Sequence, residues 1–345
     1  MKRNLAITAA LFALVGAASA QNTATTDPVG FVSVTVPAQS DAVLAVPLNR
    51  SAAFKGKIQT ISGNVITVAG TPAWTANQFV QAIPTQNDTF AIQIATGSKE
   101  GLIAKVTANT VDTLTVQFDA GDDLSGVKSV DIDGILNADE IDVMPYWTPS
   151  TLIASPPNGS ELFAFSLPGS NGPIGTNLSP SSLMVYDAGS GAWLDQISEE
   201  SVAHVALKFG SAFGFRNNSG AGFVYSCVGS VPMSKYRALL ATLAGNTDQD
   251  IRIGYASPVP ELLSAVNFPA ASGDQIFAYD NAAVGKNKSP SQILVYDGAS
   301  WLDSTTEEPV PTFTFQPGFG YVFRKFRTSN ASVAVWSDLQ SYLAP

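Results

Sequence analysis

A long internal repeat restricts how this chain can fold more than any other feature of its sequence. Gly159-Ser-Glu-Leu-Phe-Ala-Phe165 returns as Gly273-Asp-Gln-Ile-Phe-Ala-Tyr279, and each copy continues through the same motifs in the same order. These motifs are Ser-Pro-Ser (179–181 and 289–291), Val-Tyr-Asp (185–187 and 295–297), Trp-Leu-Asp (193–195 and 301–303), Glu-Glu (199–200 and 307–308), a Gly (210 and 318) and an Arg (216 and 324). A unit of roughly 110 residues that occurs twice predicts a duplicated module in the C-terminal part of the chain.

Most of the chain carries the patterns of β-strands. Apolar and polar residues alternate over residues 31–36 and 113–118, and residues 57–68 predict a hairpin that turns at Ser62-Gly-Asn64. The 28 Gly and 21 Pro residues place turns at short intervals, which is typical of sandwiches and barrels rather than of alternating strands and helices. We therefore predict an all-β fold of mostly antiparallel, sandwich- or barrel-like modules with a few short helices.

Helical patterns are few, and they suggest where the domains divide. Ser234 as a cap, good helix formers and Gly245 as a terminator predict a helix over residues 234–244 that connects the two copies. A shorter helix is expected over 257–266 and a last turn near 337–343. The expected organisation is a signal peptide (1–20), an N-terminal β domain (21–148), a first β module with its connecting helix (149–245) and a second β module (246–345).

Residues 1–20 have the features of a secretory signal peptide. Lys2 and Arg3 precede an apolar stretch from Leu5 to Val15, and Ala18-Ser-Ala20 supplies the small residues that a signal peptidase accepts. This stretch is too short to span a bilayer, and no later stretch reaches about 18 apolar residues. We predict an exported protein, in the periplasm, on the outer surface or outside the cell, without a transmembrane segment.

Composition narrows the classes of partner and of chemistry. The formal net charge is −10, so binding to nucleic acid or to anionic lipid is not expected. Cys227 and His204 are the only cysteine and histidine, which makes a zinc site or a Cys–His pair very hard to assemble. Cys227 lies in an alternating stretch and is expected to be buried, and His204 is expected to be structural. The Glu-Glu pairs leave a carboxylate-based hydrolase as the least favoured class, so we predict no catalytic residues and no enzyme.

Repeated aromatic residues are the candidate ligand-binding residues. Trp193 and Trp301 follow Tyr186 and Tyr296 at matching places in the two copies. Exposed, they could stack on sugar rings and give a multivalent glycan binder. If they are buried, they pack in the core against their hairpins, which is the commoner role of aromatic residues beside strands.

Acidic residues in a Gly-rich stretch are the candidate ligands for a bound cation. Asp119, Asp122 and Asp123 lie close together in the sequence, and calcium binds oxygen ligands on tight loops. Their spacing does not match an EF-hand loop, and a solvated acidic loop is the favoured explanation. Calcium is the only cofactor that the sequence suggests.

Several motifs resemble a secreted paralogous family expanded in Verrucomicrobia. They are Thr26-Asp-Pro-Val-Gly-Phe31, Val34-Thr-Val-Pro-Ala38, Pro72-Ala-Trp-Thr-Ala-Asn-Gln-Phe79, Pro145-Tyr-Trp-Thr148 and Pro317-Gly-Phe-Gly-Tyr321. That family is uncharacterised, so the resemblance carries over no functional residue. It implies a set of exported paralogues, which suits surface display, adhesion or assembly.

These observations together predict an exported, non-enzymatic structural or surface-interaction protein of the cell surface, adhesive or self-assembling. Its expected partners are further copies of itself or surface glycans and proteins. The alternative is a carbohydrate-binding protein that uses the repeated aromatic residues.

Overall fold

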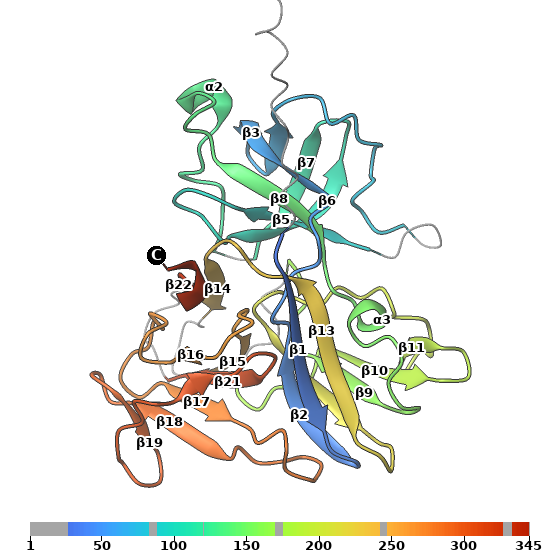
Figure 1. Ribbon diagram of the computed structural model, residues 1–345, viewed down its shortest axis with the longest axis vertical. Coiled ribbons are helices and arrows are strands. Elements are labelled where there is room, and N and C mark those ends of the chain that lie inside the picture. Colours follow the sequence, from blue (N-terminus) through green and yellow to red (C-terminus); the bar gives the residue numbers. More distant parts are fainter. Residues whose placement is uncertain are drawn as a thin grey trace, which may run out of the picture.

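The computed structural model describes residues 27–82, 88–119, 121–169, 175–241, 247–326 and 333–344, which are almost entirely antiparallel strands joined by turns (Figure 1). In these ranges α-helix is limited to α2 (Val130–Asp133) and α3 (Pro149–Leu152), and a 3-10 turn, η2, covers Ser341–Leu343. None of the described helices is long and apolar enough to cross a membrane. The predicted all-β class with a few short helices is confirmed, while the predicted signal peptide lies outside the described residues.

One five-stranded sheet contains the first copy of the sequence repeat. Its strand order is β11-β10-β9-β12-β2, and all its neighbours are antiparallel. The strands are β2 (Ser40–Ala45), β9 (Glu161–Ala164), β10 (Ser182–Asp187), β11 (Ala192–Asp195) and β12 (Ala212–Asn217). A two-stranded ribbon of β1 (Val29–Val36) and β13 (Phe223–Ser230) shares a hydrophobic core with this sheet, and we call ribbon and sheet the first unit.

A second five-stranded sheet contains the second copy and has the same strand order, β19-β18-β17-β21-β15. Its strands are β15 (Gln249–Gly254), β17 (Gln275–Ala278), β18 (Gln292–Tyr296), β19 (Trp301–Asp303) and β21 (Gly320–Lys325). A ribbon of β14 (Tyr236–Ala241) and β22 (Val333–Asp338) and a short pair of β16 (Glu261–Leu262) and β20 (Thr314–Phe315) complete the second unit. Asp41 faces Arg216 in the first sheet and Asp250 faces Arg324 in the second, so the two sheets can be compared residue by residue.

A closed barrel of six strands is inserted between β2 and β9 of the first unit, in the order β3-β4-β7-β6-β5-β8. Its strands are β3 (Phe54–Ser62), β4 (Val65–Val68), β5 (Phe90–Ile94), β6 (Ile103–Asn109), β7 (Thr113–Gln117) and β8 (Glu140–Pro145). Alternate side chains such as Ile58, Ile66 and Leu114 fill its interior, as strands with one buried face require. The strands and the hairpin that the sequence predicted over 31–36, 113–118 and 57–68 are all present. In Figure 1 the barrel lies above the two units.

Strand pairing revises the predicted division of the chain. β1 and β2 fall within the predicted N-terminal domain (21–148), but they pair with β13 and β12 of the first unit. β14 falls within the predicted first module (149–245), but it pairs with β22 of the second unit. The barrel therefore interrupts the first unit and does not precede it.

The predicted connecting helix over 234–244 is wrong, because Tyr236–Ala241 form strand β14. Tyr236 and Leu240 are buried in the core of the second unit, and this burial outweighs the weak local preference for helix. The helix predicted over 257–266 is also wrong, since these residues form turns and β16. The last turn predicted near 337–343 is present as η2.

Candidate functional site

The predicted aromatic ligand residues have different surroundings in the two units. Trp193 is 1% exposed, its indole N–H donates to the Ile153 carbonyl oxygen at 3.0 Å, and the buried Tyr186 ring packs against it at 5.5 Å. Trp301 and Tyr296 are half-buried with ring centroids 5.2 Å apart. Trp193 and Tyr186 are therefore core residues that cannot stack on a sugar, so the hypothesis of paired glycan platforms retains only Trp301 and Tyr296.

The three predicted calcium ligands are each bonded to a basic side chain. Asp119 lies 2.7 Å from Lys208, and Asp123 lies 3.1 Å from Lys99. Asp122 forms ion pairs with Arg237 and, at 3.4 Å, with Lys99. Within the described ranges no group of three His, Cys, Asp or Glu residues is placed to hold a metal ion.

Two of these ion pairs instead hold the barrel against both units. The carboxylates of Asp119 and Asp122 follow the last strand of the barrel's β6–β7 hairpin, whereas Lys208 lies in the first unit and Arg237 on β14 of the second. The side chains of Asp122 and Arg237 are both nearly buried, which is the setting in which an ion pair cannot lose one partner without cost. The acidic stretch thus has a structural use that its sequence alone did not indicate.

The repeated Glu-Glu motif forms part of a turn. Glu199 and Glu307 have φ of 57° and 60°, and their backbone N–H groups donate to the carbonyl oxygens of Asp195 and Asp303. The carboxylates of these two aspartates accept backbone N–H bonds within the same turns, and these bonds lower their pKa values. His204 lies half-buried in a separate turn, where burial lowers its pKa.

Cys227 lies on the inner face of β13 and is fully buried, as the sequence predicted. Burial raises the pKa of its thiol to about 12, so almost no thiolate forms at neutral pH. We expect iodoacetamide at pH 8 to leave the native protein unmodified and to label it fully in urea. Mass spectrometry measures the adduct, and Cys227→Ser is the control without a thiol. Native labelling as fast as labelling of the unfolded chain would contradict the burial.

The two five-stranded sheets contact each other closely along β2 and β12 of one and β15 and β21 of the other. A Cβ atom placed on Gly254 would lie 2.2 Å from the Cβ of Ala45, and one placed on Gly320 would lie 2.4 Å from that of Ala212. Real Cβ atoms do not approach so closely, so glycine is required at both positions for the sheets to pack.

Backbone hydrogen bonds across this contact are reciprocal. Ala45 of β2 donates to the Gly318 carbonyl oxygen at 2.9 Å, and Gly254 of β15 donates to the Gly210 carbonyl oxygen at 3.1 Å. Ala45 and Gly254 end corresponding strands, and Gly210 and Gly318 are the repeated glycines of the two copies. The contact therefore has the form of the interface in a two-fold symmetric dimer, although one chain makes both sides.

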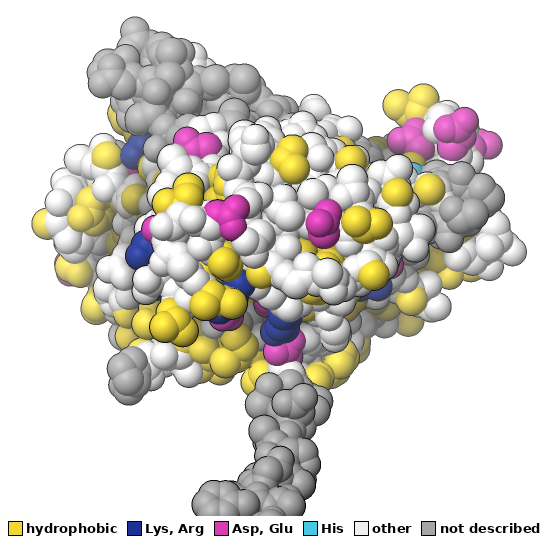
Figure 2. Space-filling model, turned by 90° about the horizontal axis from the view of Figure 1, so that it is seen from above, with side chains coloured by type: hydrophobic (Ala, Val, Ile, Leu, Met, Phe, Trp, Pro, Cys, Tyr) yellow, Lys and Arg dark blue, Asp and Glu magenta, His cyan; other side chains and the backbone are white. Residues whose placement is uncertain are grey.

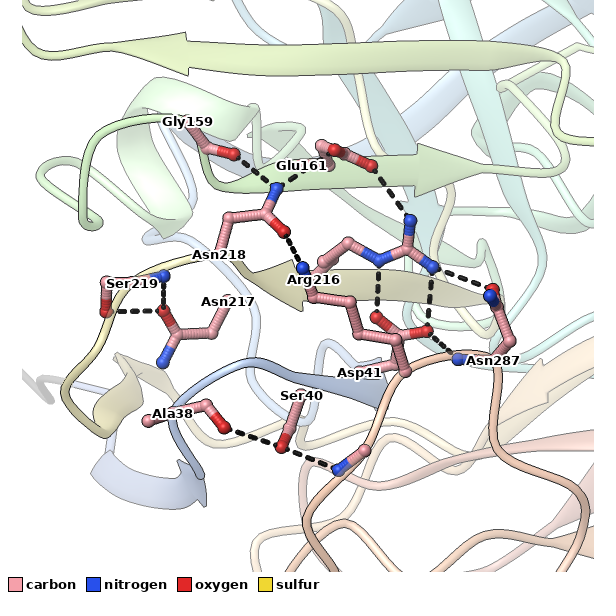
Figure 3. Close-up of polar contacts among 12 residues, drawn as sticks. Ala38, Ser40, Asp41, Gly159, Glu161, Arg216, Asn217, Asn218, Ser219 and Asn287 are labelled. Atoms are coloured by element: carbon pink, nitrogen blue, oxygen red, sulfur yellow. Dashed lines mark hydrogen bonds and ion pairs between the residues drawn. The ribbon is translucent and has the colours of Figure 1, made fainter.

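An aspartate–arginine pair on the first sheet holds a loop of the second unit (Figure 3). Arg216 donates to both carboxylate oxygens of Asp41 at 2.7 and 2.9 Å. Asp41 also accepts the backbone N–H of Asn287 at 2.6 Å, and Arg216 donates to the Asn287 side-chain oxygen at 2.8 Å. The guanidinium lies 5.4 Å from the Phe163 ring centroid, which adds a cation–π contact.

The second sheet holds a loop of the first unit through the corresponding residues. Arg324 donates to both carboxylate oxygens of Asp250 at 2.7 and 3.0 Å, and Asp250 accepts the backbone N–H of Asn177 at 2.7 Å. Asn177 and Asn287 each have φ of 52°, two residues after Gly175 and Gly285, whose φ values are also positive. The shared motif Gly-x-Asn-x-Ser-Pro-Ser is the sequence signal for these loops, and the repeated arginines are the signal for the residues that hold them.

The outer face of the β1–β13 ribbon carries exposed apolar side chains and no charged one. Its exposed apolar side chains are Val29 (74% exposed), Phe31 (65%), Val224 (53%) and Val228 (54%). Phe31 lies directly opposite Val228 in the register, and the exposed Ser33, Thr35 and Ser226 complete the face. The opposite face carries the core residues Val32, Val34, Tyr225 and Cys227. We call the exposed face the outer ribbon face.

A scan against protein-family models and searches of curated proteins and of solved structures found no match to this chain. The resemblance to a secreted verrucomicrobial family thus stays a prediction.

Proposed function

We propose that this chain is an exported, non-enzymatic structural protein of the cell surface that associates with further copies of itself through the outer ribbon face. The observation that carries the proposal is the exposure of Phe31 with Val29 and Val228 beside it, on a ribbon face without any charged residue. Contiguous apolar surface of this kind on a soluble protein marks a site of protein–protein contact.

The ribbon also lacks the residues that usually prevent an exposed strand edge from pairing with a strand of another molecule. β1 and β13 form a two-stranded sheet, so each has an outer edge that is not paired along its length with a further strand. Proteins usually protect such edges with lysine, proline or a bulge, but the eight register pairs of β1 and β13 contain none of these. In Figure 1 the two strands run side by side along the front of the first unit, where a second molecule can approach them.

Charged side chains are few on part of the surface. Acidic and basic side chains are sparse on the face that Figure 2 shows, among apolar and uncharged polar side chains. Arg237 forms an ion pair with Asp122 of the barrel region, while Arg216 and Arg324 form ion pairs within their own sheets. The net charge of −10 repels other copies, so an apolar contact between copies has to outweigh this repulsion. The signal-peptide features of residues 1–20 support export.

The test is the assembly state of the mature chain, purified from residue 21 onward. We expect filaments, layers or discrete oligomers by electron microscopy and sedimentation velocity, and their loss in the double variant Phe31→Ser/Val228→Ser. The control is Ile197→Ser, because Ile197 is 93% exposed on a turn far from the ribbon in sequence. A wild-type protein that sediments only as a monomer under native conditions, or a double variant that assembles like the wild type, would refute the proposal. Fractionation of native cells tests export separately.

A further inference from the structure

Arg252 is the exception among the arginines of the described ranges, because its guanidinium has no carboxylate partner within 4 Å. The other arginines there form ion pairs: Arg50 with Asp88, Arg216 with Asp41, Arg237 with Asp122 and Arg324 with Asp250. Arg252 instead lies with its guanidinium carbon 4.4 Å from the Phe165 ring centroid. A partly buried arginine without an ion-pair partner within 4 Å retains five N–H donors and a positive charge to satisfy.

The shared fold does not require an arginine at this position. Arg252 is the fourth residue of β15 and lies opposite Val322, while the corresponding residue of β2 is Val43, opposite Gly214. Valine is thus sufficient for packing at the same place in the first sheet. Burial lowers the pKa of Arg252 and outweighs the opposing effect of the Asp250 carboxylate.

A cavity of about 290 Å³ opens beside Arg252, between the two sheets. Residues of both units line it, including Asp41, Phe163, Phe165, Arg252, Tyr279 and Lys288. The carboxylate in this lining, Asp41, is already bonded to Arg216, and the Lys288 ammonium donates to the carbonyl oxygens of Asp280 and Ala283. The cavity therefore has aromatic walls and an excess of positive charge.

We propose that this cavity binds a small organic carboxylate, with the carboxylate on the Arg252 guanidinium and the remainder of the molecule against the aromatic walls. The planar guanidinium matches a carboxylate through two parallel hydrogen bonds. Ligand pockets usually measure about 300–1,000 Å³, so the volume suits a ligand with a single ring. A sugar acid and an aromatic acid share this chemistry. The site is independent of the outer ribbon face and of self-association.

The experiment is calorimetric titration of the mature chain with sodium glucuronate and with sodium benzoate. We expect one of the two to bind, and Arg252→Met to weaken that binding roughly 10- to 100-fold, as loss of a charged hydrogen-bond pair implies. Lys128→Met is the matched control, because it removes one positive charge from an exposed side chain in the barrel region, outside the cavity lining, and should leave the affinity unchanged. Glucose and benzyl alcohol, the neutral counterparts, should bind at least about tenfold more weakly.

Arg252→Met is expected to fold, since the wild-type guanidinium forms no ion pair to lose, and circular dichroism checks this. As a second readout, the Arg252 Nε–H resonance should shift on titration with the bound acid in wild-type protein. Binding of glucuronate alone identifies a sugar acid as the ligand class, and binding of benzoate alone identifies an aromatic acid. Absence of binding of both acids at millimolar concentration, or equal binding by the wild type and Arg252→Met, would overturn the proposal.

Discussion

Trp193→Ala should lower the free energy of unfolding by about 4 kcal/mol, the cost that removal of a buried tryptophan from a core usually has. The side chain is among the largest fully buried ones, so its loss creates a cavity between the first sheet and α3. It also leaves the Ile153 carbonyl oxygen without the indole N–H that it accepts. Urea denaturation followed by circular dichroism measures the change.

Trp301→Ala is the control for this substitution, since it occupies the same place in the second copy of the repeat but is only half-buried. Its expected loss is about half as large, because less apolar area leaves the core. Equal losses at the two positions, or a loss below about 1 kcal/mol at Trp193, would contradict the different roles that the two tryptophans have here.

Arg324→Ala should lower the free energy of unfolding by about 3 kcal/mol. The substitution leaves the Asp250 carboxylate, whose side chain is 2% exposed, without the arginine that forms an ion pair with it, and an unpaired buried charge is strongly destabilising. Arg324 itself keeps one side toward solvent, which puts the expected loss at the lower end of the range for buried pairs. Asp250 also holds the loop at Asn177, so the contact between the two units should loosen. Thermal unfolding and limited proteolysis measure both effects.

Two further variants distinguish the effect of the buried charge on stability from the effect of lost packing. Arg216→Ala removes the corresponding arginine of the first sheet, where Asp41 is 20% exposed, and should cost less because water can reach the carboxylate. Arg324→Met/Asp250→Asn removes both charges and should recover part of the stability lost in Arg324→Ala. A double variant no more stable than the single one would show that the loss does not come from an uncompensated carboxylate.

The sequence predicted the class of fold well, because strand patterns are local. Residues 113–118 alternate with a period of two and form β7, and Ser62-Gly-Asn64 joins β3 to β4. The pairing of β1 and β2 with the first unit could not be predicted in this way. Their partners β13 and β12 lie beyond the whole barrel in sequence, and no local pattern specifies contacts across such an insertion.

The functional residues also depend on contacts that local sequence patterns do not specify. The Trp-Leu-Asp motif is identical in both copies, yet Trp193 is buried and Trp301 is half-buried, because burial depends on what packs over each motif. Arg216 and Arg324 stand out as repeated residues, but their partners Asp41 and Asp250 lie upstream of the recognisable repeat. Arg252 carries no sequence signal. Its significance comes from the absence of an ion-pair partner within 4 Å in the described residues, which only the three-dimensional arrangement reveals.

The reciprocal contact between the two sheets has a consequence for how this molecule can change. In a symmetric dimer of identical chains, every substitution occurs twice, once on each side of the axis. Here the two sides are encoded separately, so valine can stand at position 43 while arginine stands at position 252. One half can preserve the packing while the other acquires a charge, an aromatic hydroxyl or a different loop. Because one chain forms both units, the contact can have a cavity lined by Arg252 without a matching arginine on the other side. Two identical chains could not form such an asymmetric site.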